Sequence, residues 1–239
     1  MRRADMKIGM MQPYFFPYIG YFQLLNMVDK YVVFDTAYFA NIKWGFRNRI
    51  LINGASGFFR VKTLKASQNK QFNEIKVSED NESKKTSIHT LECAYGKAPH
   101  FQEVMPMLEQ FLMADYDNLS EYNVASNRLI CNYLGIKTEI LLFSELNCDK
   151  DLKMQYRIFD VCRVLGGSEY INAIGGTELY DFEEFRENGI ELAFLKTDDI
   201  VYPQFGGEFV PSLSIIDVMM FNSVPEIRDM LNRYTLIKA

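Results

Sequence analysis

The sequence of 239 residues has few of the side chains from which metal and redox centres are built. It contains two histidines, His89 and His100, and its four cysteines form no C-x-x-C pair and no zinc-type spacing. We therefore predict no metal site, while a general-base role for one of the histidines stays open. The cysteines are Cys93, Cys131, Cys148 and Cys162.

Long apolar runs and an excess of positive charge are also missing. No apolar stretch reaches the roughly 20 residues that a bilayer crossing needs, so we expect no membrane span. Residues 1–5 form a short charged lead unlike a signal peptide, which we expect to be disordered. The net charge of −5 does not favour nucleic acid as a partner. Because Cys131 and Cys162 lie in apolar helical patterns typical of buried thiols, we predict a cytoplasmic protein.

The first ordered stretch of the chain predicts the opening of a sheet. An apolar run over residues 6–11 is followed by Gln12, and apolar residues then recur at helical spacing over residues 19–28. A second apolar run, over residues 31–34, ends in Asp35. This order of strand, loop, helix and strand is typical of a parallel sheet, where ligands bind beyond the carboxyl ends of the strands. We therefore predict that Gln12 and Asp35 face one crevice.

The rest of the chain continues the alternation of strands and helices. It predicts an α/β fold with a mainly parallel sheet of Rossmann/nucleotidyltransferase-like type. A hairpin is expected from strands at 48–53 and 58–63 joined by residues 54–57. We predict a single α/β domain over residues 6–239, in which residues 81–135 form a mostly helical insertion or cover. The expected helices there span residues 83–95, 99–113 and 119–134.

An aromatic and basic segment follows Asp35. Lys43, Arg47 and Arg49 lie close to Trp44, the only tryptophan. Arg47 and Arg49 are two residues apart, so on a strand their side chains share one face. One interpretation is a clamp for a phosphate or carboxylate. The alternative is a solvated strand edge, where basic side chains prevent aggregation.

Two aspartates, Asp35 and Asp217, are the predicted catalytic carboxylates. Asp35 is the candidate base, because burial at a strand end favours the protonated form of a carboxylate. Its alternative role is to accept hydrogen bonds from the backbone or an arginine. Ser214 and Asp217 have the spacing of a capping box with Asp in place of Glu, so they can begin the last helices. The same pair can also bind hydroxyl groups near the sheet edge.

Several segments resemble those of the WbqC-like family, and together they cover almost the whole chain after Met6. The resemblance implies a bacterial protein associated with surface polysaccharide or O-antigen pathways, or with other small-molecule assembly clusters, and it implies no named reaction. The matching segments are residues 12–21 (QPYFFPYIGY), the strand end at Asp35, 46–50 (FRNRI), 95–101 (YGKAPHF), 170–172 (YIN) with Gly175, 202–204 (YPQ) and 211–217 (PSLSIID).

A second likeness concerns the start of the first predicted helix. Tyr18 and Tyr21 stand where nucleotidyltransferases carry a His-x-Gly-His signature, whose imidazoles contact phosphates. Tyrosines carry no positive charge near neutral pH, although they donate hydrogen bonds. The likeness therefore implies a related architecture with different chemistry.

These observations support a group-transfer enzyme that acts on an anionic donor, either a nucleotide-linked sugar or an activated acyl compound. Catalysis would rest on positioning and electrostatics. The alternative is a non-catalytic binding or scaffolding protein of the same pathway, with residues 13–21 as an exposed contact surface. A nucleotidyltransferase-like enzyme is a further alternative, and no cofactor is specified by the sequence. The predicted site residues are Gln12, Tyr18, Tyr21, Asp35, Lys43, Arg47, Arg49, Ser214 and Asp217.

Overall fold

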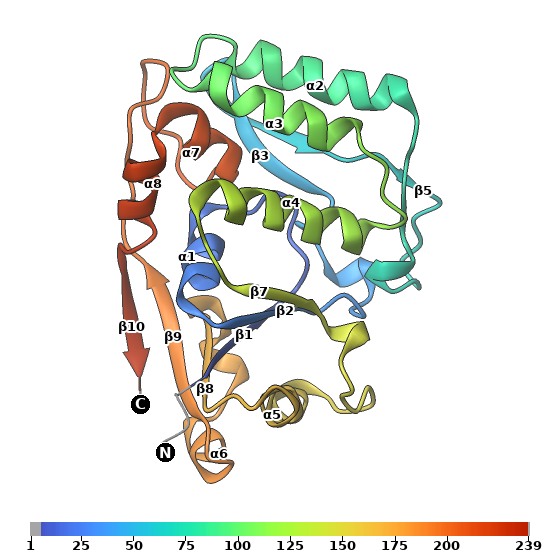
Figure 1. The fold of residues 1–239 in the computed structure, drawn as a ribbon, viewed down its shortest axis with the longest axis vertical. Helices are drawn as coiled ribbons and strands as arrows, with labels where there is room; N and C mark the ends of the chain where they lie inside the picture. The colour runs from blue at the N-terminus through green and yellow to red at the C-terminus, as the bar shows by residue number, and fades with distance from the viewer. Residues whose placement is uncertain (1–5, 239) are drawn as a thin grey trace.

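A six-stranded sheet forms the centre of the protein in a computed structural model that describes residues 6–238 (Figure 1). The predicted disorder of residues 1–5 lies outside the described residues. The order across the sheet is β10-β9-β8-β1-β2-β7, and only the β9–β10 pair is antiparallel. The strands are β1 (Lys7–Met11), β2 (Lys30–Val33), β7 (Glu139–Leu142), β8 (Glu169–Ala173), β9 (Glu191–Thr197) and β10 (Tyr234–Lys238).

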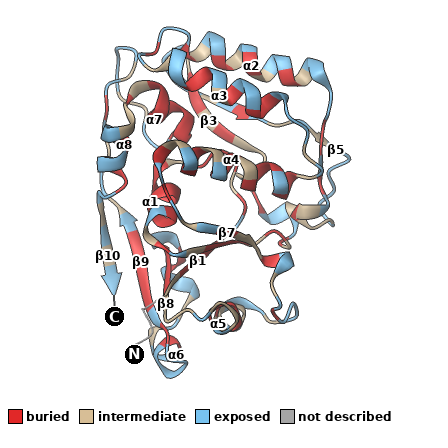
Figure 2. Ribbon diagram, in the orientation of Figure 1, coloured by how far each residue is buried: buried red, intermediate tan, exposed pale blue. Residues whose placement is uncertain are grey.

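Helices cover both faces of this sheet. Side chains alternate along β2, so that Tyr31 and Val33 join one apolar core and Val32 joins the other. The first core contains α1 (Ile19–Met27), α4 (Leu119–Leu134) and α7 (Ile215–Phe221), and the second contains α5 (Met154–Leu165) and α6 (Phe182–Glu187). Figure 2 shows β9 buried between these layers and β10 exposed at the edge. The predicted α/β class with a mainly parallel sheet is confirmed.

The strand order places a change of direction beside β1. From β1 the sheet grows through β2 to β7 on one side, and through β8 to β9 on the other. In open α/β sheets, ligands bind outside the carboxyl ends of the strands where such a change occurs. The carboxyl ends of the strands beside β1 are therefore the expected position of the predicted site residues.

Residues 34–80 leave the sheet to form two small antiparallel hairpins. The first joins β3 (Arg47–Ile52) to β4 (Ala55–Arg60), and the second joins β5 (Thr63–Leu64) to β6 (Lys76–Val77). Asn53 and Gly54 both have positive φ, at 52° and 76°, which suits a tight two-residue hairpin turn. The predicted connection over residues 54–57 is therefore wrong, and β4 begins earlier than expected.

The helical part between residues 81 and 135 contains the three predicted helices. They are α2 (Asn81–Tyr95), α3 (Phe101–Met113) and α4, and Gly135 ends α4 in a left-handed conformation (φ 76°). Apolar residues of all three belong to the same core as α1 and α7. Their description as an insertion stays a prediction. The remaining elements are α8 (Val224–Met230) and the short 3₁₀ helices η1 (Phe39–Asn41), η2 (Phe72–Glu74), η3 (Phe143–Glu145) and η4 (Ile174–Leu179).

Two further predictions concern burial and membranes. Cys131 and Cys162 are buried free thiols, as expected from their apolar patterns. Across residues 6–238, none of the helices combines the length and the apolar character that a bilayer crossing requires.

Candidate functional site

The loop between β1 and α1 is anchored by hydrogen bonds to distant segments. The Phe15 N–H donates to the Trp44 carbonyl at 2.8 Å. The Phe16 carbonyl accepts from Asn48 Nδ2 at 2.6 Å and from Ser214 Oγ at 2.8 Å. Phe16 is held at φ 38°, a conformation that side chains with a Cβ seldom adopt. The loop, the β3 strand and the start of α7 are thus fixed to one another.

A second network lies beneath this anchor, around Asp217. Its carboxylate accepts hydrogen bonds from Tyr95 Oη at 2.8 Å, Tyr202 Oη at 2.7 Å and Gln204 Nε2 at 2.8 Å. Tyr95 Oη also accepts from the Leu51 N–H at 3.0 Å. Burial raises the pKa of the Asp217 carboxyl, and the three donors partly oppose that rise. Donors therefore reach both carboxylate oxygens, and Asp217 links the segments that carry Tyr95, Tyr202 and Gln204.

The β3–β4 hairpin carries several cations on one face. Across the two strands Arg47 pairs with Arg60, and Arg49 pairs with Phe58. Directly opposed residues of an antiparallel pair project from the same face, where two like charges destabilise each other. We refer to this surface as the basic hairpin face, and its members are Lys43, Trp44, Arg47, Arg49, Phe58 and Arg60.

Carboxylates do not neutralise this face. Among the residues from 6 to 238, no Asp or Glu oxygen lies within 4.0 Å of its charged nitrogens. The Arg47 guanidinium lies 4.9 Å from the ring centre of Phe58, and that of Arg49 lies 5.7 Å from Trp44. Arg49 Nη2 donates to the Ser212 carbonyl at 3.1 Å, while its enclosed Nε has no acceptor in the described part of the chain. The face can therefore take up an anion.

Tyrosines border the basic hairpin face. The Tyr14 ring stacks on Trp44 with centres 6.0 Å apart, and it lies 6.2 Å from the ring of Tyr18. Burial and the neighbouring Tyr18 raise the pKa of Tyr14 to about 12, although Arg49 acts in the opposite sense. Tyr18 lines a groove of about 420 Å³ together with Ser212, whose carbonyl Arg49 binds, and Thr197 at the end of β9. Burial also raises the pKa of Tyr18, so both phenols remain protonated donors at neutral pH.

Asp35 borders a different cavity. It follows β2, and its Oδ1 accepts from the Ser144 N–H at 2.9 Å. Its Oδ2 accepts from Ser144 Oγ at 2.6 Å and Asn73 Nδ2 at 3.3 Å. The cavity, which we refer to as the Asp35 hollow, measures about 520 Å³. It is lined by Asp35, Gln71, Asn73, Glu74, Asn118, Ser120, Glu121, Leu142, Ser144 and Glu145.

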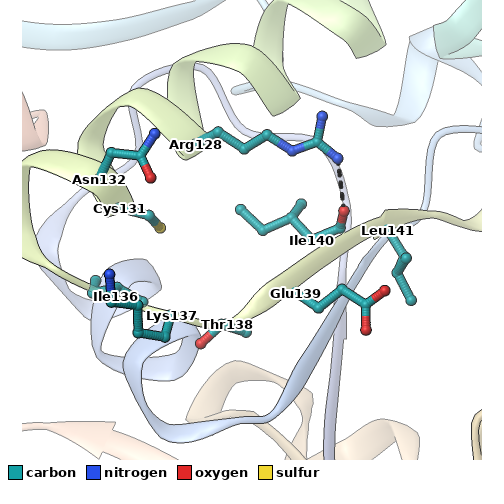
Figure 3. A pocket seen from close by; sticks show the side chains of 9 residues that line it. All are labelled: Arg128, Cys131, Asn132, Ile136, Lys137, Thr138, Glu139, Ile140 and Leu141. Atoms are coloured by element: carbon teal, nitrogen blue, oxygen red, sulfur yellow. Dashed lines mark hydrogen bonds between the residues drawn. The ribbon is translucent and has the colours of Figure 1, made fainter.

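A further hollow of about 380 Å³ lies between α4 and β7, and Figure 3 shows the residues that line it. Arg128 Nη2 donates to the Ile140 carbonyl there at 2.9 Å, which satisfies a backbone group of the edge strand. The lining includes Lys137 and Thr138, which precede β7, and it contains none of the predicted site residues. This hollow therefore runs along β7 from the residues that precede the strand.

The predicted site residues fall into separate places. Gln12 is exposed beyond β1 and does not line the Asp35 hollow. Tyr21 is buried in the core, with its ring centre 5.2 Å from that of Tyr31, so it cannot take the place of a phosphate-binding histidine. Ser214 caps α7 as predicted, but Asp217 bonds elsewhere and does not complete a capping box. The assignment of Asp217 as a catalytic carboxylate stays a prediction.

Sequence reasoning missed three residues that the structure brings into these places. Arg60 joins the basic hairpin face because the Asn53–Gly54 turn sets the register, and recognising that turn would have placed it opposite Arg47. Asn73 and Ser144 reach Asp35 from other parts of the chain, and no local pattern signals them.

Similarity to known proteins extends over most of the chain. A family model described as the WbqC-like protein family matches residues 12–229. The chain is also similar to an uncharacterized protein of Mycobacterium tuberculosis, with 28% identity over 228 residues that cover 94% of this chain and 97% of the relative. No solved structure matches the chain.

Proposed function

The chain belongs to the WbqC-like protein family, and from this premise we propose that it is a cytoplasmic group-transfer enzyme of polysaccharide biosynthesis. Its donor would be an anionic activated compound, either a nucleotide-linked sugar or an acyl donor. The observation that carries the proposal is the basic hairpin face, where Arg47 opposes Arg60 without a carboxylate within 4.0 Å among residues 6–238.

The arrangement around this face suits a phosphorylated donor. Arginine forks bind phosphate oxygens in pairs, and a bound anion would remove the repulsion between Arg47 and Arg60. The ring of Phe58, which is 48% exposed and lies 6.4 Å from that of Trp44, offers a surface on which a base can stack. During transfer, the arginines would stabilise the charge that develops on the leaving group.

Asp35 is the carboxylate that we assign as the base. It follows β2, which pairs with β1, and the loop after β1 reaches the basic hairpin face through Trp44. An acceptor in the Asp35 hollow would meet an unpaired negative charge, since no lysine, arginine or histidine lines that hollow within the described chain. Asp217 has no part in the proposed chemistry, because side-chain donors surround it.

The alternative of a non-catalytic scaffold relied on an exposed surface at residues 13–21. Most of that segment is buried, including Phe15, Phe16 and Tyr21, and only Tyr14 and Tyr18 are partly accessible. The segment therefore offers no extended apolar patch of the kind that marks a docking surface. The transferase proposal is favoured for this reason.

Isothermal titration calorimetry with UDP-glucose and acetyl-CoA tests the donor site. We expect at least one of them to bind, and Arg49→Ala and Arg60→Ala each to weaken that binding by about tenfold or more, the value of a charge-assisted hydrogen bond. Arg186→Ala removes a cation from α6 on the opposite face of the sheet and should leave the affinity unchanged. Failure of both compounds to bind, or equal losses in all three variants, would contradict the proposal.

Transfer itself requires a second measurement. Once a donor binds, we expect Asp35→Asn to slow release of its leaving group by at least about a hundredfold, as removal of a general base does. The affinity for the donor should stay within about twofold of wild type, since the basic hairpin face is unchanged. Equal turnover in the variant and the wild type would remove Asp35 from the mechanism.

A further inference from the structure

The Asp35 hollow carries negative charge and no positive charge. Four of its lining residues are acidic, namely Asp35, Glu74, Glu121 and Glu145, and none of its lining residues within positions 6–238 is basic. Two cations stack on rings that adjoin lining residues in the chain, Arg157 on Phe34 at 4.3 Å and Lys150 on Phe143 at 4.3 Å, yet neither of them lines the hollow. An anionic group would therefore be repelled here.

Two buried oxygens of the hollow have no hydrogen-bond donor within residues 6–238. Ser120 is 1% exposed, it lines the hollow, and its Oγ has no hydrogen-bond partner among the residues that the structure describes. Asn73 uses Nδ2 to reach Asp35, while its enclosed Oδ1 likewise has no partner within residues 6–238. An amide oxygen can only accept, so it requires an N–H or O–H from a ligand. Buried polar groups left without partners are costly, which makes these oxygens a positive indication of a bound molecule.

The chemistry of this lining distinguishes between kinds of cation. A divalent metal needs several carboxylates that converge, but no group of three His, Cys, Asp or Glu side chains within the described residues is arranged to hold one. Two of the acids are also engaged with the backbone, because Glu74 accepts from the Gln71 N–H and Glu121 accepts from the Asp117 N–H, at 2.7 and 2.8 Å. A compact group with several N–H donors fits a single buried carboxylate with neutral oxygens beside it.

We propose that the Asp35 hollow binds the primary ammonium group of a small amine-bearing molecule, such as an amino sugar. Asp35 supplies the counter-charge, Asn73 Oδ1 and Ser120 Oγ accept the remaining N–H bonds, and Glu145 at the exposed rim raises the local concentration of cations. Identifying this amine as the acceptor of the transfer rests on the proposed function. The binding itself does not.

Calorimetric titration without any donor tests the inference, using glucosamine and N-acetylglucosamine as probes. The two sugars share a ring, but acetylation removes the positive charge. We expect glucosamine to bind at least about tenfold more tightly at pH 6.5, which corresponds to one charge-assisted hydrogen bond. Equal affinities, or absence of binding by glucosamine, would overturn the inference.

Substitutions in the Asp35 hollow test where glucosamine binds. Asp35→Asn and Ser120→Ala should each weaken glucosamine binding, the first by about tenfold or more and the second by a few-fold. Glu145→Gln, at an exposed position that is safe for folding, should weaken it about twofold. Glu187→Gln, which removes the same charge from α6, should have no effect. An equal loss in Glu187→Gln would show binding to net charge alone and contradict the site.

Two controls separate the possible failures. Competition by 5 mM MgCl₂ against glucosamine, with Mg²⁺ binding lost in Asp35→Asn, would identify a metal site and overturn the ammonium assignment. Arg49→Ala should retain full glucosamine binding, because it belongs to the basic hairpin face. If glucosamine binds while UDP-glucose and acetyl-CoA do not, then the proposed function fails and the ammonium site stands.

Discussion

Two buried aspartates, Asp35 and Asp217, differ in what surrounds them rather than in how deeply they lie. Both are 0% exposed, and each accepts three hydrogen bonds. The donors of Asp217 are Tyr95 and Tyr202, which are buried, and Gln204, which is partly exposed. Two of the donors of Asp35 come from Ser144, an exposed residue at the rim of a hollow. Access through that rim, and not burial, separates a candidate site from a structural anchor.

This contrast also divides the segments that resemble the family. Residues 95–101, 202–204 and 211–217 supply Tyr95, Tyr202 and Asp217, and these side chains enclose one another. The segment at residues 46–50 contributes Asn48 to the anchored loop, whereas its arginines stay without carboxylate partners in the described chain. Neighbouring residues of one motif therefore serve the fold and the proposed ligand separately.

The largest difference between the two aspartates should appear on truncation. Asp217→Ala leaves two buried tyrosine hydroxyls and the partly exposed Gln204 amide without their acceptor, and it should lower the free energy of unfolding by about 3 kcal/mol or more. Asp35→Ala should lower it by only about 1 kcal/mol, because water can enter the hollow and bond Ser144 and Asn73. Urea denaturation of both variants measures this. Equal losses of unfolding free energy in the two variants would contradict the difference drawn between Asp217 and Asp35.

The pH dependence of stability sharpens the contrast further. The pKa of Asp217 is raised by burial above its unfolded value of 3.8, so the stability that this group contributes is fully present below pH 3.8 and is lost as pH rises through the folded pKa. Asp217→Asn stays neutral, so wild type should lose stability relative to this variant as pH rises above about 4 and through the folded pKa of Asp217. Urea titrations at several pH values test this. A constant difference would contradict the raised pKa.

Other carboxyl groups change the stability with pH in the opposite direction, but their contributions cancel when wild type is compared with Asp217→Asn. Hydrogen bonds, above all from Ser83, lower the pKa of Asp80 to about 2, and those of Ser223 lower the pKa of Glu226. These groups stabilise the fold as pH rises, but they are present in both proteins. Subtracting the stability of Asp217→Asn from that of wild type at each pH therefore isolates the contribution of Asp217.

Removal of a single donor from each aspartate should give a smaller effect. Tyr202→Phe deletes the hydroxyl that lies 2.7 Å from Asp217 Oδ2, and we expect a loss of about 1.5 kcal/mol because the carboxylate stays enclosed. Thermal and urea unfolding measure the loss. Tyr156→Phe removes an exposed hydroxyl as a control and should change the stability by less than about 0.5 kcal/mol. A loss in Tyr202→Phe no greater than this would show that water reaches Asp217.

The smallest effect is expected at the rim of the Asp35 hollow. Ser144→Ala removes one hydroxyl donor from Asp35, while the Ser144 backbone N–H stays in place at 2.9 Å. Because this residue is exposed, water can replace the lost hydroxyl, and we expect a loss of about 0.5 kcal/mol. Urea denaturation measures it. A loss as large as that of Tyr202→Phe would mean that the hollow is closed to water.

Some parts of the fold and site were predictable, and others were not. Local patterns sufficed for α2, for α4 with Gly135 at its end, and for the cap at Ser214, because each depends on residues within one or two turns. The hairpin was found but its turn was misplaced, so Arg60 was not recognised on the basic hairpin face. Asp35 lies just beyond β2, close to the predicted strand end, but Gln12 does not line the same hollow.

By itself, the sequence determined the α/β alternation, the position of Asp35 after the second strand and the shared face of Arg47 and Arg49, since periodicity and capping act over short separations. Only the tertiary structure decided which carboxylate is accessible. Asp35 meets Ser144 across 109 residues and Asp217 meets Tyr95 across 122, so neither environment is written in neighbouring positions. Enclosure depends on the packing of distant segments, and for that reason two aspartates that look alike in the chain differ in the folded protein.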